Sequence, residues 1–193
     1  MEAEKIRESI KRASQDLFRK YGYHKTSVNE IAKKAKLAKA TIYKYFDSKE
    51  LLLHSILMDY IRSSVHDLLH SDHEEQSRDI YLSNLILKTS RISYTICNEF
   101  IGWDFIREST NAQEFLKILS DDLEKLLIES FNDIDEFKND EAISEDGLKF
   151  LIKSSKSIVF SFAFTAVSDS DVRKNFVSFQ KEILPYLVKA ALR

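Results

Sequence analysis

The apolar positions of the chain recur every three or four residues along most of its length, which is the spacing of one face of an α-helix. Breaks in this pattern predict helices over residues 1–21, 28–35 and 39–46 and a long helix from residue 48 to about 69. Further helices are expected over 78–98, 111–131 and 144–166, with a last one from residue 169 that Pro185 should kink near its end. The FSFAF run at 160–164 alternates as a strand does, but it lies inside a helical pattern and is expected to be helical.

The two short helices over 28–35 and 39–46 have almost no linker between them and predict a helix-turn-helix. A hydroxyl of Thr26 or Ser27 can cap the first of them, and Glu30 three residues after Ser27 completes a capping box. In the second helix Ile42 and Phe46 are expected to face inward, so polar and basic side chains face outward. Such side chains reach phosphates and base edges, and this face therefore predicts a DNA-docking surface.

Short motifs at fixed spacing continue through this region: Gly22-Tyr23, Thr26-Ser27, Ile31-Ala32, Ala35, the run from Ala38 to Phe46, and the run from Lys49 to Leu52. Together they resemble the N-terminal DNA-binding signature of the TetR family of bacterial transcriptional regulators. The chain departs from the family pattern at Lys36, Ala38 and Ala40, where Gly, Ser and Gly are common. Lys36 is therefore expected in a left-handed backbone conformation, and Ala38 can offer no side-chain cap.

The resemblance implies an all-α protein with a three-helix helix-turn-helix DNA-binding domain over 1–47 and a larger helical ligand-binding and dimerisation domain over 48–193. It also implies a homodimer that binds a palindromic operator in double-stranded DNA, most often as a repressor, and that a small-molecule effector releases. The residues implied at the DNA are Thr26, Ser27, Lys39, Ala40, Thr41, Tyr43, Lys44, Tyr45 and Lys49, with Tyr45 on the buried side of its helix.

The sequence of the second domain carries fewer specific signals of function. Its aromatic residues could line a pocket for a lipophilic or aromatic effector, although plain core is the alternative for each. The candidates for this pocket are Tyr94, Phe100, Trp103, Phe105, Phe115 and Phe162. Lys88 or Arg91 could pair with an anionic head group, but exposed helix charges are the simpler interpretation. The last helices have two apolar faces, so their second face predicts self-association. The candidates for this interface are Leu148, Leu151, Ile152, Val159, Phe176, Ile183, Leu184 and Leu187.

Charge is unevenly distributed over the 193 residues. Residues 1–50 contain 13 Lys and Arg against 7 Asp and Glu, whereas the remainder contains 16 against 24. A basic first part on an acidic body is expected when only the first part meets a polyanion. No apolar stretch reaches the roughly 18 residues of a membrane span, and the N-terminus is charged, so we expect a cytoplasmic protein without a membrane partner. The single cysteine, Cys97, fits a reducing compartment.

No glycine-rich phosphate loop, cysteine pair or catalytic triad is visible, so the sequence predicts neither an enzyme nor a bound cofactor. His66, His70 and His73 share a helix face and could bind a metal, but no second cluster completes the coordination and a polar helix end is favoured. Two alternative functions remain at this point. One is a ligand-independent DNA-binding protein that recruits or organises other factors, and the other is a helical protein-binding module.

Overall fold

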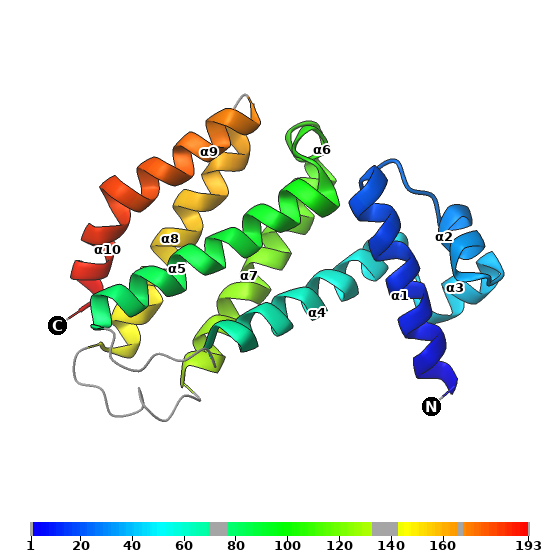
Figure 1. The fold of residues 1–193 in the computed structure, drawn as a ribbon, viewed down its shortest axis with the longest axis horizontal. Helices are drawn as coiled ribbons and strands as arrows, with labels where there is room; N and C mark the ends of the chain where they lie inside the picture. Colours follow the sequence, from blue (N-terminus) through cyan, green and yellow to red (C-terminus); the bar gives the residue numbers. More distant parts are fainter. Residues whose placement is uncertain (1, 70–76, 133–142, 166–167, 193) are drawn as a thin grey trace.

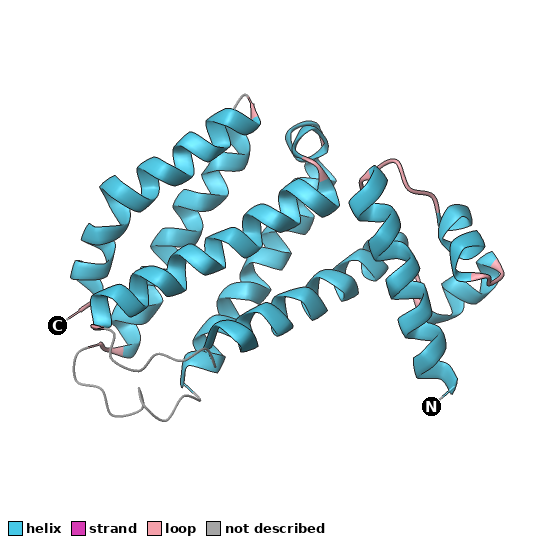
Figure 2. Cartoon of the chain, in the orientation of Figure 1, coloured by secondary structure: helices cyan, strands magenta, loops and turns pink. Residues whose placement is uncertain are grey.

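The computed structural model describes residues 2–69, 77–132, 143–165 and 168–192, which are almost entirely helical (Figures 1 and 2). The N-terminal helices are α1 (Glu2–Tyr21), α2 (Val28–Ala35), α3 (Lys39–Tyr45) and α4 (Lys49–Leu69). They are followed by α5 (Arg78–Thr95), the π-helical turn η1 (Ile96–Ile101), α6 (Trp103–Glu108) and α7 (Thr110–Asn132). The last elements are α8 (Glu145–Thr165), α9 (Asp169–Ser178), the π-helical turn η2 (Phe179–Ile183) and α10 (Leu184–Ala191). The predicted all-α class is confirmed.

The first three helices form a small bundle at one end of the molecule, and α4 runs from this bundle into the larger body (Figure 1). We call α1–α3 the head. Helices as short as α2 and α3 are not stable alone in water, so they depend on packing against α1. The side chains that build this core are at most 5% exposed, and they are Ile10, Phe18, Ile31, Ile42 and Phe46.

The local signals of the helix-turn-helix act as predicted. The side-chain oxygen of Ser27 accepts a hydrogen bond from the backbone N–H of Glu30 at 3.3 Å, and a Glu30 carboxylate oxygen accepts one from the backbone N–H of Ser27 at 2.8 Å. The capping box is therefore complete. Lys36 has φ 56° and ψ 40°, which is the left-handed conformation expected there, and Ala38 gives α3 no side-chain cap.

Replacing Lys36 by glycine is expected to raise the free energy of unfolding by about 1 kcal/mol, because glycine removes the contact between Cβ and backbone that disfavours the left-handed region. Urea denaturation at one protein concentration measures this difference. Lys33→Gly is the matched control: it lies inside α2 and should lower the free energy of unfolding by about 1 kcal/mol. Destabilisation by both substitutions would show that Lys36 is not strained.

The body comprises α4 to α10, and within the chain α4 packs against α1, α5 and α7. This helix buries residues along its whole length, from Leu52 near its start to Leu69 at its end, so it links the head to the body's core. α5 continues into η1, and Gly102 with φ 96° then redirects the chain into α6. The chain between the predicted helices over 78–98 and 111–131 is thus a π-helical turn, which begins at Ile96, followed by a short helix.

The C-terminal helices pack closely on α8. At Gly147 a β-carbon would lie 2.3 Å from the carbonyl oxygen of Ala191, so only glycine allows this approach. Ser144 caps α8, since its hydroxyl accepts a hydrogen bond from the N–H of Gly147 at 3.0 Å. The FSFAF run lies within α8 and is helical, as expected. Pro185 lies in the first turn of α10 directly after η2, and its missing N–H explains why the helix is interrupted there.

Several residues predicted at the dimer interface lie instead in the core of a single chain. α8 packs against α5 and α10, which uses the apolar stripe of α8 within the protomer. The four residues concerned are at most 3% exposed, and they are Leu148, Leu151, Ile152 and Leu184. Val159 and Phe176 also pack against this core, as do the half-buried Ile183 and Leu187. Residues 133–142, between the predicted helices over 111–131 and 144–166, lie outside the described residues.

Candidate nucleic-acid interface and internal cavity

The outer face of α3 presents the side chains that the helix-turn-helix pattern assigned to DNA. Ile42 points into the head and is 2% exposed, which turns the opposite face outward. The end of α3 is held against α1, because Arg7 donates a hydrogen bond to the backbone carbonyl of Tyr45 at 3.2 Å and its guanidinium lies 4.6 Å from the Phe46 ring centre. The exposed residues of α3 are Lys39, Ala40, Tyr43 and Lys44, and the half-buried ones are Thr41 and Tyr45.

The electrostatic character of this face is basic. Lys33 and Lys34 of α2 are exposed close in sequence to the turn residue Lys36, which is also exposed. Lys34 lies 3.1 Å from a carboxylate oxygen of Asp16 on α1, an exposed ion pair that contributes little to stability. Lys39 and Lys44 of α3 are exposed as well, so α2, the turn and α3 all carry lysines that could neutralise phosphates.

Three of the residues implied at the DNA, namely Thr26, Ser27 and Lys49, have different roles in the structure. Thr26 is 3% exposed and donates its hydroxyl hydrogen bond to the carbonyl of Gly22 at 2.9 Å, so Thr26 is a structural residue of the loop. Ser27 is exposed, so of Thr26 and Ser27 it is Ser27 that can reach a phosphate. The Lys49 ammonium donates to the backbone carbonyls of Tyr23 at 3.1 Å and Thr26 at 3.0 Å, and burial lowers its pKa. Lys49 therefore holds the loop that precedes α2.

Tyr23 also donates a hydrogen bond from its hydroxyl to a Glu50 carboxylate oxygen at 2.5 Å, and this bond holds the pKa of Glu50 below its ordinary value of 4.5. The bond therefore stabilises the fold above that value, and the contribution is lost as pH falls through the folded-state pKa. We expect Tyr23→Phe to lower the free energy of unfolding by about 1 kcal/mol at pH 7 and by much less at pH 3. Urea denaturation at both pH values measures this. Tyr43→Phe, at a side chain that is 42% exposed, is the control, and a loss of stability that does not depend on pH would contradict the role of Glu50.

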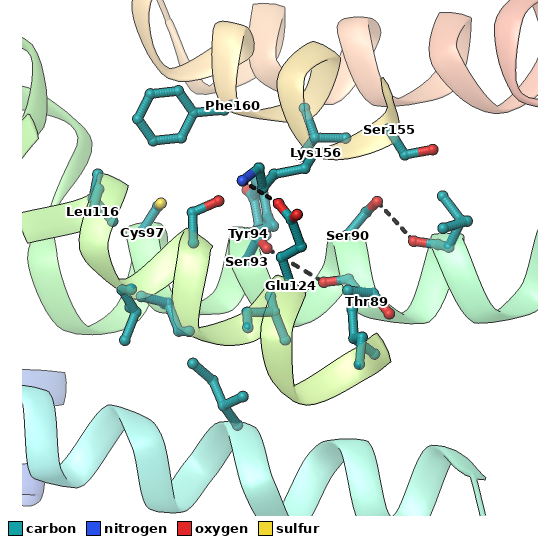
Figure 3. A pocket seen from close by; sticks show the side chains of 18 of the residues that line it. Thr89, Ser90, Ser93, Tyr94, Cys97, Leu116, Glu124, Ser155, Lys156 and Phe160 are labelled. Carbon is teal, nitrogen blue, oxygen red and sulfur yellow. Dashed lines mark hydrogen bonds and ion pairs between the residues drawn. The ribbon is translucent and has the colours of Figure 1, made fainter. Parts of the chain in front are cut away.

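A second feature is an internal cavity in the body, with a volume of about 90 Å³ (Figure 3). α5, η1, α7 and α8 form most of its wall, and α4 and α9 contribute Ile61 and Phe176. The wall is mainly apolar. Cys97 of η1 lies in it, and burial raises the pKa of its thiol to about 12, so the thiol stays protonated at neutral pH.

Hydroxyl groups interrupt the apolar wall. On α5, Thr89 and Ser90 donate hydrogen bonds to the backbone carbonyls of Leu85 and Ile86, each at 2.7 Å. Ser155 of α8 lies across the cavity from α5 (Figure 3). It is 3% exposed, and its hydroxyl has no hydrogen-bond partner within the described part of the chain. A buried hydroxyl without a partner is unusual and marks a place where a bound group can supply one.

One ion pair reaches the cavity. Lys156 of α8 pairs with Glu124 of α7 (Figure 3) and, at 2.8 Å, with Asp121 on the outer side. Burial acts to lower the pKa of Lys156, but the hydrogen bonds to Asp121 and Glu124 outweigh it and the pKa is raised. Lys156 therefore stays charged and bound to carboxylates.

Of the six residues predicted for a ligand pocket, Tyr94 and Trp103 line this cavity and the other four do not. Phe100 is wholly buried, and the ring of Phe105 stacks on His24 with centres 4.7 Å apart. Phe115 lies 6.2 Å from the His54 ring, and Phe162 packs 5.2 Å from Phe176. The serine and threonine residues were missed, although hydroxyls at 89, 90 and 93 in an apolar helix are a visible signal.

The turn η1 touches both the cavity and the head. Ile96 and Cys97 contribute to the cavity wall. The carbonyl of Phe100 accepts a hydrogen bond from the backbone N–H of Tyr23 at 2.9 Å, and the Arg19 guanidinium lies 4.9 Å from the centre of the Phe100 ring. π-Helical turns are frequent at functional sites. A change in the cavity therefore has a direct contact route to the end of α1.

Other sites find less support. Within residues 2–69, 77–132, 143–165 and 168–192, no group of three His, Cys, Asp or Glu residues is arranged to hold a metal ion. His70 and His73, which the sequence placed with His66, lie outside those ranges. None of the described helices is long and apolar enough to cross a membrane. The exposed Lys88 and Arg91 are not among the residues of the cavity wall.

Parts of the chain are similar to known proteins. Residues 10–56 match the family model for bacterial regulatory proteins of the tetR family. YuxN of Bacillus subtilis (strain 168), described as an uncharacterised HTH-type transcriptional regulator, is 54% identical over 44 residues, which are 23% of this chain and 15% of YuxN.

Solved structures match over almost the whole chain. RolR in complex with resorcinol is 17% identical with a TM-score of 0.61, and the match covers 98% of this chain and 94% of RolR. A single-residue variant of TetR from Acinetobacter baumannii AYE, in complex with minocycline, is 13% identical with a TM-score of 0.59, and the match covers 93% of this chain and 92% of that one. At these identities the matches show a shared fold.

Proposed function

The chain belongs to the TetR family of bacterial transcriptional regulators, and from this premise we propose that it is a repressor that binds a palindromic operator as a homodimer and is released by a small-molecule effector. The observation that carries the proposal is the exposed face of α3, where Lys39, Tyr43 and Lys44 stand on a capped and well-packed helix-turn-helix. In this proposal residues 1–47 act as the DNA-binding domain and residues 48–193 as the ligand-binding and dimerisation domain. The protein works where the chromosome is, in the cytoplasm.

At the operator, α3 enters the major groove. Tyr43 and Lys44 reach base edges and phosphates, while the small side chain of Ala40 permits close approach. Lys39 and the half-buried Thr41 flank this contact, with Tyr45 at its edge. Ser27 contacts a phosphate at the start of α2, and Lys49 acts by holding the loop of Thr26 in place. Two heads related by two-fold symmetry would read half-sites about 34 Å apart.

The dimer forms through the outer faces of α8 and of the α9–α10 path. Large apolar side chains are exposed there: Phe150 is 43% exposed, Val177 is 50% and Tyr186 is 74%. The half-buried Ile183 and Leu187 lie on the same C-terminal path. A second copy that covers these side chains would bury apolar area that a single chain leaves in water.

The effector binds in the internal cavity and acts on the head through η1. A ligand that presses on Ile96 or Cys97 would shift η1, and the contacts of Phe100 with Tyr23 and Arg19 would carry this shift to α1. Because α1 packs against α2 and α2 packs against α3, the two recognition helices of a dimer would leave their matching grooves.

The test begins with sheared genomic DNA of the source bacterium, from which the purified protein selects fragments that are then sequenced. A palindromic motif, bound by two protomers in a mobility shift and much more weakly at 200 mM than at 50 mM salt, is the expected result. Binding without sequence selectivity, or without salt dependence, would contradict an operator-binding regulator. An operator complex that no small molecule releases would favour a ligand-independent DNA-binding protein.

A further inference from the structure

We infer that the internal cavity takes an uncharged, mainly apolar molecule that carries a hydroxyl group, such as a phenol or an alcohol. Where it identifies this molecule as the effector, the inference rests on the proposed function. Binding to the cavity can nevertheless be measured without DNA. The inference follows from three properties of the cavity wall. Its side chains are mainly apolar, its charges are paired, and its hydroxyl groups differ in whether they can donate or accept a hydrogen bond.

The apolar character comes from aliphatic and aromatic side chains of six helices and η1. Leu116, Leu119 and Leu123 of α7 face Ile86 of α5 and Ile152 of α8 around the cavity. A molecule that enters removes its apolar surface from water, at about 25 cal/mol per Å² of area buried. Most of the ligand must therefore be hydrocarbon or aromatic ring.

The charges on the wall argue against an ionic ligand. Lys156 is the only cation lining the cavity among the described residues, and it is bound by Glu124 and Asp121. Glu124 also lies 3.9 Å from Lys153, so these four groups carry no net charge and each cation among them is already paired. A carboxylate or phosphate would therefore lose its hydration without gaining a free cation. An ammonium group would have to displace Lys156 from Glu124. A neutral ligand avoids both costs.

The hydroxyl groups determine which polar group a neutral ligand needs. Thr89 and Ser90 use their hydrogen atoms on backbone carbonyls, so only their oxygen lone pairs remain for a ligand, and these accept hydrogen bonds. Ser155 has no partner in the described structure and can either donate or accept. A ligand hydroxyl can donate to one wall and accept from the other, whereas an ether, ketone or hydrocarbon cannot do both.

Two matched probe series test this inference on the purified protein in the absence of DNA. One series is 4-phenylphenol, biphenyl, biphenyl-4-carboxylate and 4-(aminomethyl)biphenyl, and the other carries the same groups on a propylbenzene scaffold. Trp103, the single tryptophan, lines the cavity and reports binding by its fluorescence. We expect the phenol of at least one series to bind about 10-fold or more tightly than its hydrocarbon, carboxylate and amine analogues.

Ser155→Ala identifies the group responsible. It should weaken the bound phenol about 3- to 10-fold and leave the hydrocarbon analogue unchanged. Ser157→Ala is the matched control, because Ser157 is exposed on the same helix and donates its hydrogen bond to the carbonyl of Lys153. Circular dichroism and thermal unfolding check that both variants remain folded.

Absence of binding in both series, tighter binding of a carboxylate or an amine, or equal effects of Ser155→Ala on phenol and hydrocarbon would overturn the inference. The proposed function has a separate readout, namely release of the operator complex by the same compounds. Phenol binding without an effect on DNA would uphold the cavity chemistry and count against effector release. Operator binding that only an ionic compound relieves would uphold the regulator and overturn the cavity chemistry.

Discussion

Replacing Tyr43 and Lys44 by alanine together is expected to weaken operator binding at least about 100-fold while the protein stays folded and dimeric. Both side chains are exposed on α3, and Tyr43 is 42% exposed, so neither substitution opens a cavity in the head. A contact to a base edge is worth about 1–3 kcal/mol, and a lysine lost from a phosphate reduces affinity further. Fluorescence anisotropy with a labelled operator fragment at fixed salt gives the dissociation constant.

The controls for this experiment distinguish the loss of contacts made by α3 from a general loss of positive charge. Lys117→Ala removes an exposed lysine on α7, in the body, and should change operator affinity less than about 2-fold. Lys49→Ala is informative in a different way: its ammonium holds two loop carbonyls, so it should lower thermal stability as well as affinity. Undiminished operator binding by the Tyr43 and Lys44 double variant would show that α3 is not the recognition helix.

Phe100→Ala is expected to lower the free energy of unfolding by about 3–5 kcal/mol, which is typical of a buried phenylalanine. Its ring is 0% exposed, lies 6.0 Å from the centre of the Tyr60 ring, and is covered by the Arg19 guanidinium. Thermal and urea denaturation at one protein concentration measure the loss, since the stability of a dimer depends on concentration. Ile118→Ala, at a side chain that is 55% exposed, should change stability by less than about 0.5 kcal/mol.

Phe100→Ala also tests whether the contact between η1 and the head transmits the effector signal. Leu82→Ala removes a side chain that is 1% exposed, on α5 within the body, and should destabilise by a comparable amount. If η1 transmits the effector signal, Phe100→Ala should reduce the effect of a bound ligand on operator affinity more than Leu82→Ala does. Equal coupling in the two variants, at equal loss of stability, would show that the signal takes another route.

The head was predictable because its signals are local. Ser27 and Glu30 lie three residues apart, so their capping box depends only on the start of one helix. The left-handed conformation of Lys36 follows from its place in a tight turn, and the inward position of Ile42 follows from helical periodicity. The FSFAF run was correctly assigned to a helix for a similar reason, since the longer period outweighs a short alternation.

The cavity and the interface were less predictable, because periodicity says that a side chain is buried but not what it packs against. Phe105 was placed in a ligand pocket, yet it stacks on His24 of the head. Leu148 and Leu151 were assigned to a partner subunit, yet α10 and α5 of the same chain cover them. Each of these assignments depends on helix neighbours that are distant in sequence.

The sequence by itself therefore determined the all-α class, the helices of the head and the outward face of α3, since these follow from contacts within a few residues. Only the tertiary structure decided that Lys49 holds a loop, that η1 joins the cavity to the head, and that Ser155 and the Lys156–Glu124 pair face a common space. These features bring together residues from separate helices, and the angles and distances between helices are set by side-chain packing across the whole body.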